Sequence, residues 1–237
     1  MEKRRNVSAS VREGAISALP LIFGFFPVSM AFGLLSKSVG VSFAESCLFS
    51  IMVFAGASQF MALDLIKAGA AAGNIILATF LLNLRHLMMS ASLSVRLKEI
   101  KRHWLIFIAF GITDETFSVS SLRNKKLEVP FLITLHSLPY CSWVLGTAVG
   151  YTAGAVLPAS LRDSLGIGLY SMFMALLMPE VKKSLSVLFL SVFSGMIYAA
   201  ITYFSILPSS WSLIASIVIA AGAGALVIGD EMKEAEA

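Results

Sequence analysis

Charge is scarce in this chain of 237 residues. Asp, Glu, Lys and Arg together make up 14% of it, whereas hydrophobic residues make up 57%. About a quarter of the residues in an average soluble domain are charged. Apolar runs recur along the whole chain, so one signal peptide does not account for them. The composition therefore excludes an ordinary soluble domain and predicts a membrane protein.

Cysteine and histidine are also scarce. The two cysteines, Cys47 and Cys141, lie in apolar stretches without a CxxC spacing, which excludes a disulfide framework. The three histidines show no metal-ligand spacing, and the chain has no nucleotide-binding loop, so we expect no cofactor. The net charge of +4 comes from basic residues scattered in short connectors. Because they form no basic face, we expect no nucleic-acid partner.

Long apolar runs take the place of charge. A helix that spans a lipid bilayer needs about 20 mostly apolar residues. Candidate spans lie at residues 15–36, 45–67, 72–95, 104–119, 129–150, 164–178, 184–206 and 211–229. They lack the alternation of polar and apolar residues that marks barrel strands. The sequence predicts an all-α, polytopic integral membrane helix bundle with seven or eight transmembrane segments, in one membrane-embedded domain over residues 1–237.

Two of these segments, 104–119 and 164–178, are short for a complete crossing. Short segments, or segments interrupted by Gly or Pro, are typical of broken or re-entrant helices in transporters. A tilted bundle that contains one or two short helices explains the same pattern.

Lys and Arg in the connectors indicate how the chain is oriented. The basic arm at residues 1–13 predicts a cytoplasmic N-terminus. Eight crossings would then place the most basic connector, residues 96–103, on the outside. Either this connector is an exception to the rule, or one of the segments before it does not cross.

A weak internal similarity predicts two related halves. "QFMALDL", starting at Gln59, is similar to "MFMALLM", starting at Met172, and the pair "DE" at 114–115 recurs at 230–231. Transporters are often built from two such halves. The acidic tail at residues 230–237 is expected to be solvated.

A polar cluster interrupts the third apolar segment. "LLNLRHLMMS" at 81–90 contains Asn83, Arg85 and His86. Arg85 lies too deep in the segment to anchor its end, and a charged residue there costs about 2.5–3.5 kcal/mol on insertion. Because arginine keeps its proton, it needs a partner. That partner is either a structural carboxylate of the protein or the carboxylate of a substrate.

Asp114 and Glu115 are the obvious protein partners for Arg85. Adjacent residues on a helix point about 100° apart, so only one of the two can meet Arg85 well. The other could titrate, because a neighbouring like charge raises the pKa of a carboxyl group. The pair therefore predicts a proton-coupling site, and a cap at a helix end is the alternative.

"VFAGASQFMALDL" at 53–65 is a second cluster. Its small residues, 55–58, permit either close helix packing or local unwinding. Gln59 is a neutral polar group among them. It either belongs to a packed helix interface or contacts a substrate together with exposed backbone groups.

Four motifs occur in one order along the chain: "PLIFGFFPVSMAFGLL", "FAGASQFMAL", "LLNLRHLMMSASL" and "TDETFSV". In that order and spacing they resemble the AzlC family, the large subunits of branched-chain amino acid exporters, over residues 12–230. The resemblance implies export of leucine, isoleucine, valine and related analogues, in some members also methionine. It also implies a small membrane partner subunit of the AzlD type. The match is less clear over 160–180.

Six residues of this chain fall on recurrent positions of the family. We assign substrate binding to Gln59, Asn83, Arg85 and His86, and proton coupling to Asp114 and Glu115. These individual roles are inferred from the chemistry described above.

The sequence therefore predicts a secondary transporter, not an enzyme, that exports branched-chain amino acids across the bacterial cytoplasmic (inner) membrane with proton coupling. An intramembrane enzyme would use His86 as the base and Asp114 or Glu115 as the acid, but no nucleophile or metal is placed beside them. A passive channel would favour rings of like charge over a single deep arginine.

Overall fold

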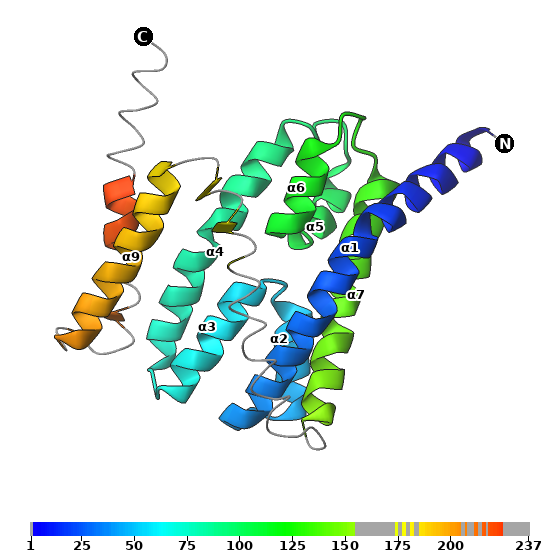
Figure 1. Cartoon of the computed structure of the whole chain (residues 1–237). Coiled ribbons are helices and arrows are strands. Elements are labelled where there is room, and N and C mark those ends of the chain that lie inside the picture. The colour runs from blue at the N-terminus through cyan, green and yellow to red at the C-terminus, as the bar shows by residue number, and fades with distance from the viewer. Residues whose placement is uncertain are drawn as a thin grey trace, which may run out of the picture. The chain divides into compact units, whose positions relative to one another are not determined.

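The computed structural model of the chain describes residues 2–154, and beyond them 174, 177–178, 181–182, 185–204, 207, 211–212, 215–216 and 218–224 (Figure 1). No strand occurs among these residues. Four of their helices are long and apolar enough to cross a membrane: Val7–Val39 within α1 (Glu2–Val39), α4 (Ala72–Ser94), α7 (Val129–Ala153) and α9 (Leu185–Tyr203). The predicted all-α bundle of membrane helices is confirmed.

The chain packs as two compact units. Unit 1 comprises residues 1–63 and 80–169, and unit 2 comprises residues 64–79 and 170–237. Within unit 2, α9 exposes large apolar side chains, as expected of a helix in lipid. The predicted span at 164–178, the second copy of the repeat and the acidic tail fall wholly or largely outside the described residues, and the span at 211–229 falls partly outside them.

In unit 1, α1 and α7 run in the same direction and pack closely. Gly14 faces Phe131 near one end of the pair, and Gly33 faces Thr147 near the other. The glycines at this interface are Gly14 and Gly33 on α1 and Gly146 and Gly150 on α7. Small residues let two helix backbones approach closely in a membrane, and the GxxxG spacing of 146–150 is typical of such contacts.

Two of the predicted spans, 45–67 and 104–119, are each broken into two half-helices. The half-helices are α2 (Phe43–Met52), α3 (Gly56–Lys67), α5 (Arg102–Phe110) and α6 (Asp114–Leu122). Residues 53–55 separate the first pair and residues 111–113 the second. The break in 104–119 agrees with the broken helix that its short length indicated, whereas 45–67, predicted as one candidate span, is not a single crossing helix.

The first pair, α2 and α3, folds into a hairpin against α1. Phe49 of α2 and Phe60 of α3 both pack on Phe32 of α1, with ring centroids 6.3 and 5.6 Å away. The turn between the half-helices contains Ala55, next to Gly56 at the start of α3. The small residues that permit local unwinding therefore lie where the chain reverses.

The second pair, α5 and α6, reverses at a capped turn. The Thr113 hydroxyl accepts a hydrogen bond from the Thr116 amide at 3.3 Å, and the Thr116 hydroxyl donates to the Gly111 carbonyl at 2.9 Å. These bonds satisfy backbone groups that a broken helix leaves open. The first turn of α6 therefore begins in a fixed position.

The two hairpins enter unit 1 from opposite ends. Near the end of α7, the Tyr151 hydroxyl donates to the Val41 carbonyl, just before α2, at 3.0 Å. Toward the N-terminal end of α1, Arg123, just after α6, pairs with Glu13 at 3.0 Å. The hairpins therefore run toward each other from the two sides and are re-entrant.

The connector at 96–103 lies on the same side as the N-terminal part of α1. Glu99 in this connector pairs with Lys126, which follows α6. Because α5 and α6 return to the side from which they enter, the most basic connector and the basic N-terminal arm share one side. The conflict that eight crossings predicted is thereby removed, and the charges agree with one orientation.

One arrangement of elements occurs twice in the chain. A half-helix, a break, a second half-helix and a long helix follow one another in α2–α3–α4 and again in α5–α6–α7 (Figure 1). Leu93 and Leu97, at the end of α4, share a core cluster with Leu127 and Phe131, at the start of α7. Because α4 ends where α7 begins, the two copies run in opposite directions. This inverted repeat differs from the repeat that the sequence predicted.

Candidate functional site

One helix, α4, reaches the first turns of both returning half-helices. Arg85 Nη1 lies 2.7 Å from Asp114 Oδ2, in the first turn of α6. Asn83 Nδ2 donates a hydrogen bond to Ser58 Oγ, in the first turn of α3, at 3.1 Å. The predicted pairing of Arg85 with one of two adjacent carboxylates is therefore present. Together with the Asn83–Ser58 hydrogen bond, this pairing links α4 to both breaks.

The positive ends of two helix dipoles face this cluster. The first turn of a helix leaves N–H groups without partners and favours nearby negative charge. Asp114 and Glu115 occupy the first turn of α6, and the Arg85 guanidinium adds a full positive charge. The Arg85 and Asp114 side chains are 35% and 32% exposed, so the ion pair is not sealed in the core. The cluster is suited to hold a carboxylate.

Two buried polar atoms of this cluster have no hydrogen-bond partner within the described part of the chain. They are Asn83 Oδ1, an acceptor, and Arg85 Nε, a donor. Leaving a buried polar group unpaired costs about 1–3 kcal/mol. The site therefore offers one acceptor and one donor beside the atoms that already bind Ser58 and Asp114.

Gln59 lies at the packed contact between the first break and α7. Its buried side-chain amide donates to the Phe49 carbonyl at 3.0 Å and the Val53 carbonyl at 2.8 Å. Its oxygen accepts from the Trp143 indole N–H at 2.9 Å. Because these bonds tie the end of α2 to α3 and α7, Gln59 fixes the shape of the first break.

His86 and Glu115 stand next to the ion pair in sequence. Both are partly buried. The structure does not bring either of them into an ion pair with the side chains described. The roles assigned to them stay predictions.

The sequence analysis missed Tyr140, on α7. Its ring packs edge-to-face on Phe54 in the first break and on Phe110 at the end of α5, with centroids 5.4 and 5.5 Å apart. Its hydroxyl donates to the Ile51 carbonyl at 2.8 Å. Tyr140 therefore contacts the tips of both hairpins.

Two neighbours of Tyr140 on α7 cover the glycines of the breaks. A Cβ at Gly56 would come within 2.6 Å of the Trp143 ring, and one at Gly111 within 2.6 Å of His136 Nδ1. Positions 136, 140 and 143 follow an i, i+4, i+7 spacing, so they share one face of the helix. Polar and aromatic residues at this spacing in an apolar helix are a signal that sequence reasoning can use.

Metal binding has no evident site in the part of the chain that the structure describes. No group of three His, Cys, Asp or Glu side chains there could hold an ion.

Long apolar helices, two opposed hairpins of half-helices and an ion pair beside their breaks define a polytopic helical membrane protein with a polar site among its helices. Residues 20–157 match the family model described as AzlC protein. The chain belongs to the AzlC family.

Three relatives illustrate this membership. An uncharacterized membrane protein of Archaeoglobus fulgidus is 35% identical over 74% of this chain and 78% of its own length. Inner membrane protein YgaZ of Escherichia coli is 31% identical over 84% of each chain. The branched-chain amino acid transport protein AzlC of Bacillus subtilis is 29% identical over 65% of this chain and 62% of its own length. No solved structure matches the chain.

Proposed function

We propose that this chain is the large subunit of a secondary transporter that exports branched-chain amino acids from the bacterial cytoplasm, driven by protons. Family membership and the name of the Bacillus subtilis relative support an amino-acid substrate. The observation that carries the proposal is the Arg85–Asp114 ion pair, which links α4 to the second break beside an uncommitted donor and acceptor, while Asn83 links α4 to the first break.

An amino acid in its zwitterionic form complements these groups. Its carboxylate accepts hydrogen bonds, and Arg85 Nε and the first-turn N–H groups of α3 are donors. Its ammonium donates, and Asn83 Oδ1 is an acceptor. Both uncommitted side-chain atoms are shielded in this structure, so a substrate reaches them when the hairpin tips move apart. His86 borders the same position, and Gln59 keeps the first break in shape.

Coupling follows from competition for Arg85. The carboxylate of the arriving substrate competes with Asp114 for the guanidinium, which leaves Asp114 beside Glu115 with less positive charge to balance both. Binding one proton on this carboxylate pair relieves the repulsion. Releasing the substrate lets Asp114 pair with Arg85 again and returns the proton.

The small partner subunit of the AzlD type belongs to the same proposal. Within unit 1, α4 exposes large apolar side chains such as Phe80, Leu87 and Met88, which a second membrane subunit or lipid covers. The basic side shared by the N-terminal arm and residues 96–103 supports a cytoplasmic N-terminus.

Transport into vesicles tests the proposal. The chain is reconstituted with and without the small subunit, and labelled leucine, valine, alanine and lysine are followed with and without a proton gradient. We expect uphill movement of leucine and valine only with the gradient and the small subunit.

Downhill flux that no gradient can drive uphill would instead indicate a channel. Chemical conversion of the label would indicate an enzyme. Equal transport of lysine and leucine would contradict the substrate class, and full activity of the chain alone would contradict the partner.

A further inference from the structure

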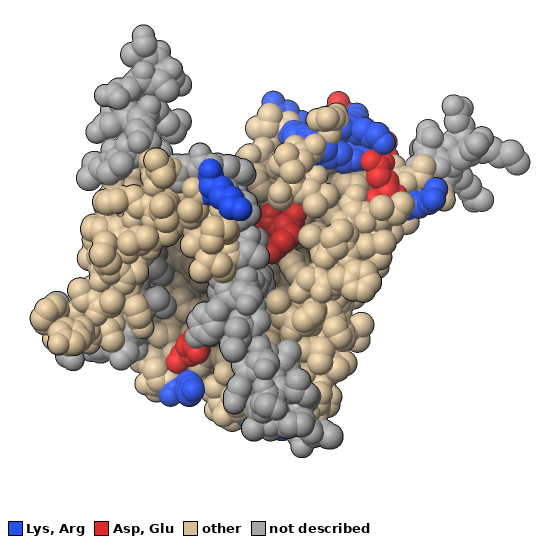
Figure 2. Space-filling model, in the orientation of Figure 1, with Lys and Arg blue, Asp and Glu red and all other residues tan. Residues whose placement is uncertain are grey.

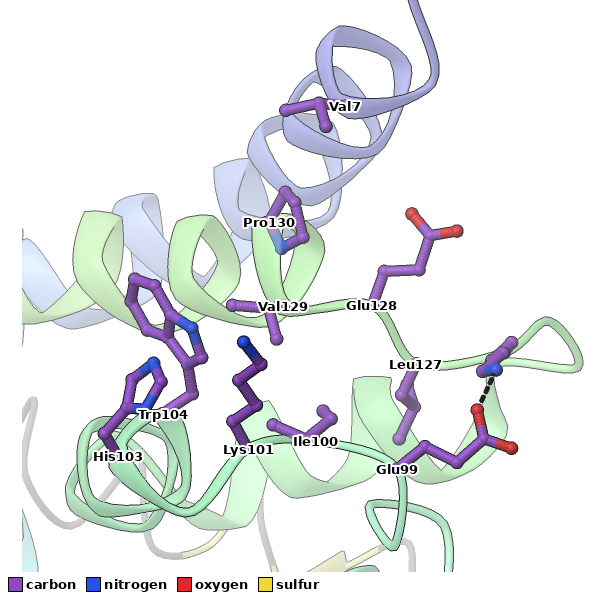
Figure 3. Close-up of a pocket in the computed structure, with 11 residues that line it drawn as sticks. Val7, Glu99, Ile100, Lys101, His103, Trp104, Leu127, Glu128, Val129 and Pro130 are labelled. Carbon is purple, nitrogen blue, oxygen red and sulfur yellow. Dashed lines mark hydrogen bonds and ion pairs between the residues drawn. The ribbon is translucent and has the colours of Figure 1, made fainter. Parts of the chain in front are cut away.

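A pocket on the basic side of unit 1 is separate from the transport site. Its volume is about 510 Å³. Its walls come from the start of α1, the connector before α5 and the connector before α7, as Figure 3 shows. This volume lies within the range of about 300–1,000 Å³ that small-molecule sites occupy.

The pocket lies at the boundary between polar and apolar parts of the chain. Val7 begins the apolar span of α1, Val129 begins α7, and Lys101 immediately precedes α5, and all three residues line the pocket. The ends of apolar membrane helices lie at the depth of the lipid headgroups. Trp104, 37% exposed at the same pocket, has the amphipathic ring that favours this depth.

Three of the charged residues that line the pocket already have partners. Lys126 pairs with Glu99, and its hydrogen bond holds the pKa of the Glu99 carboxyl below the usual value. The Ser10 hydroxyl donates to Glu128. Lys126 therefore balances the Glu99 charge, and the Glu128 carboxylate, held by Ser10, points away from the Lys101 amino group in Figure 3.

Lys101 is left as the cation of the pocket. Its side chain has no hydrogen bond or ion pair among the described residues, and no side chain caps α5 at this position. In Figure 3 its amino group points into the space between Trp104 and Val129. The Lys101 ammonium therefore faces the inside of the pocket, beside apolar side chains.

The surroundings add positive charge. Residues 96–103 and 123–128 contain seven Lys or Arg against two Glu. Figure 2 shows this gathering of Lys and Arg at one end of unit 1. A cluster of this kind beside membrane helices attracts anionic lipids, with about 1 kcal/mol per basic residue near the surface.

We propose that this pocket binds the headgroup of an anionic phospholipid, with the phosphate on Lys101 and the glycerol and upper acyl carbons against Trp104, Val129 and Pro130. Lipid at this position would pack between the start of α1 and the α5–α6 hairpin. The proposal does not depend on what the protein transports.

Lipid retention tests the site on the full chain. Wild-type protein is reconstituted in nanodiscs of equal parts phosphatidylglycerol and phosphatidylcholine, extracted mildly, and weighed by native mass spectrometry with its retained lipids. We expect preferential retention of phosphatidylglycerol. Lys101→Gln should lower that retention about fivefold, the equivalent of one basic contact, and Lys101→Arg should preserve it.

Lys98→Gln is the matched control, because it removes the same charge three positions away from an exposed side chain that does not line this pocket. Its retention of phosphatidylglycerol should equal that of the wild type. Equal losses in Lys101→Gln and Lys98→Gln would overturn the site in favour of diffuse charge. Equal retention of both lipids by the wild type, or displacement of phosphatidylglycerol by added inorganic phosphate, would overturn the lipid assignment.

Discussion

Arg85 and Arg96 hold opposite ends of the same half-helix. Arg85 pairs with Asp114 in the first turn of α6 at 2.7 Å. Arg96 donates to carbonyls at and beyond the last turn of α6, including Ser120 at 2.8 Å and Ser121 at 3.0 Å. Carbonyls at a helix C-terminus carry partial negative charge, so a guanidinium there completes the helix. Because one arginine lies on α4 and the other shortly after it, any movement of α6 is linked to α4.

Arg96→Gln should loosen the α5–α6 hairpin without unfolding the bundle. The substitution removes hydrogen bonds to four backbone carbonyls, those of Ser120, Ser121, Arg123 and Lys125. We expect a loss of about 1–3 kcal/mol in the local stability of α6. Hydrogen exchange of the α6 amides should rise about tenfold or more, whereas exchange in α7 should be unchanged. If α6 keeps wild-type protection, the Arg96 contacts do not hold the half-helix.

Arg85→Lys should fold and yet transport poorly. Lysine keeps the charge that faces Asp114 but removes the Nε donor, which lies buried and uncommitted beside the ion pair. A hydrogen bond to a charged group contributes about 1.5–3 kcal/mol, so transport at limiting leucine should fall at least about tenfold. Resistance of cells to a toxic leucine analogue measures the effect. Arg12→Lys, at an exposed position of α1, is the control and should be neutral. If Arg85→Lys cells keep wild-type resistance, the guanidinium has no specific role in binding the substrate.

The position of Arg85 could be predicted, and that of Arg96 could not, for one physical reason. A charged residue inside an apolar run is energetically costly and easy to recognise in a sequence, so it predicts a partner of opposite charge. A basic residue in a connector is expected in any membrane protein. Its partners here are backbone carbonyls 24 to 29 positions away, and backbone groups leave no mark in a sequence.

For a similar reason, the sequence predicts a break in the second hairpin more clearly than in the first. Residues 104–119 are too short to cross, which predicted a break, whereas residues 45–67 are long enough and mostly apolar, so their small residues at 55–58 left close packing and unwinding both open. Hydropathy reports that a segment avoids water and says nothing about the direction of its backbone. Hydrogen bonds that Gln59 donates to the Phe49 and Val53 carbonyls, and one that it accepts from the Trp143 indole N–H, hold the first reversal.

Gly111→Ala should destabilise the protein through His136 alone. The φ of Gly111 is −83°, which any residue adopts, so the backbone itself tolerates a side chain. The new Cβ would lie 2.5 Å from His136 Cβ, too close without movement of α7 or of the hairpin tip. Overpacking of this kind costs about 1–3 kcal/mol. Thermal unfolding in detergent should show the loss.

Two further variants test whether the stability loss in Gly111→Ala comes from the contact with His136. Gly24→Ala, in α1, adds a methyl group with nothing within 4 Å, so it should be neutral or slightly stabilising. Gly111→Ala should cost less stability in a His136→Gly background than in the wild type, because both the obstructing Cβ and the ring are gone. If the stability losses of the two single variants simply add in the double variant, the effect of Gly111→Ala does not act through His136.

Glu115→Gln should uncouple transport from protons. Arg85 balances Asp114 at 2.7 Å, so we propose that Glu115, the next residue of the same first turn, is the carboxylate that gains and loses the proton. A neutral amide at this position cannot carry that proton. We therefore expect uphill export of leucine to stop while counterflow, which exchanges labelled for unlabelled leucine without net proton movement, survives.

Asp114→Asn distinguishes proton coupling by the two carboxylates from a purely structural role at the start of α6. It removes the partner of Arg85, so uphill export should also fail, but the freed guanidinium should still hold the leucine carboxylate and counterflow should persist. Both assays are run in vesicles at several pH values, beside the wild type. If the two carboxylates only cap the helix, each substitution should lower the stability of the protein and leave the pH profile of transport unchanged. If both variants drive uphill export with an unchanged pH profile, the two carboxylates only stabilise the start of α6, and the proton is carried elsewhere in the chain.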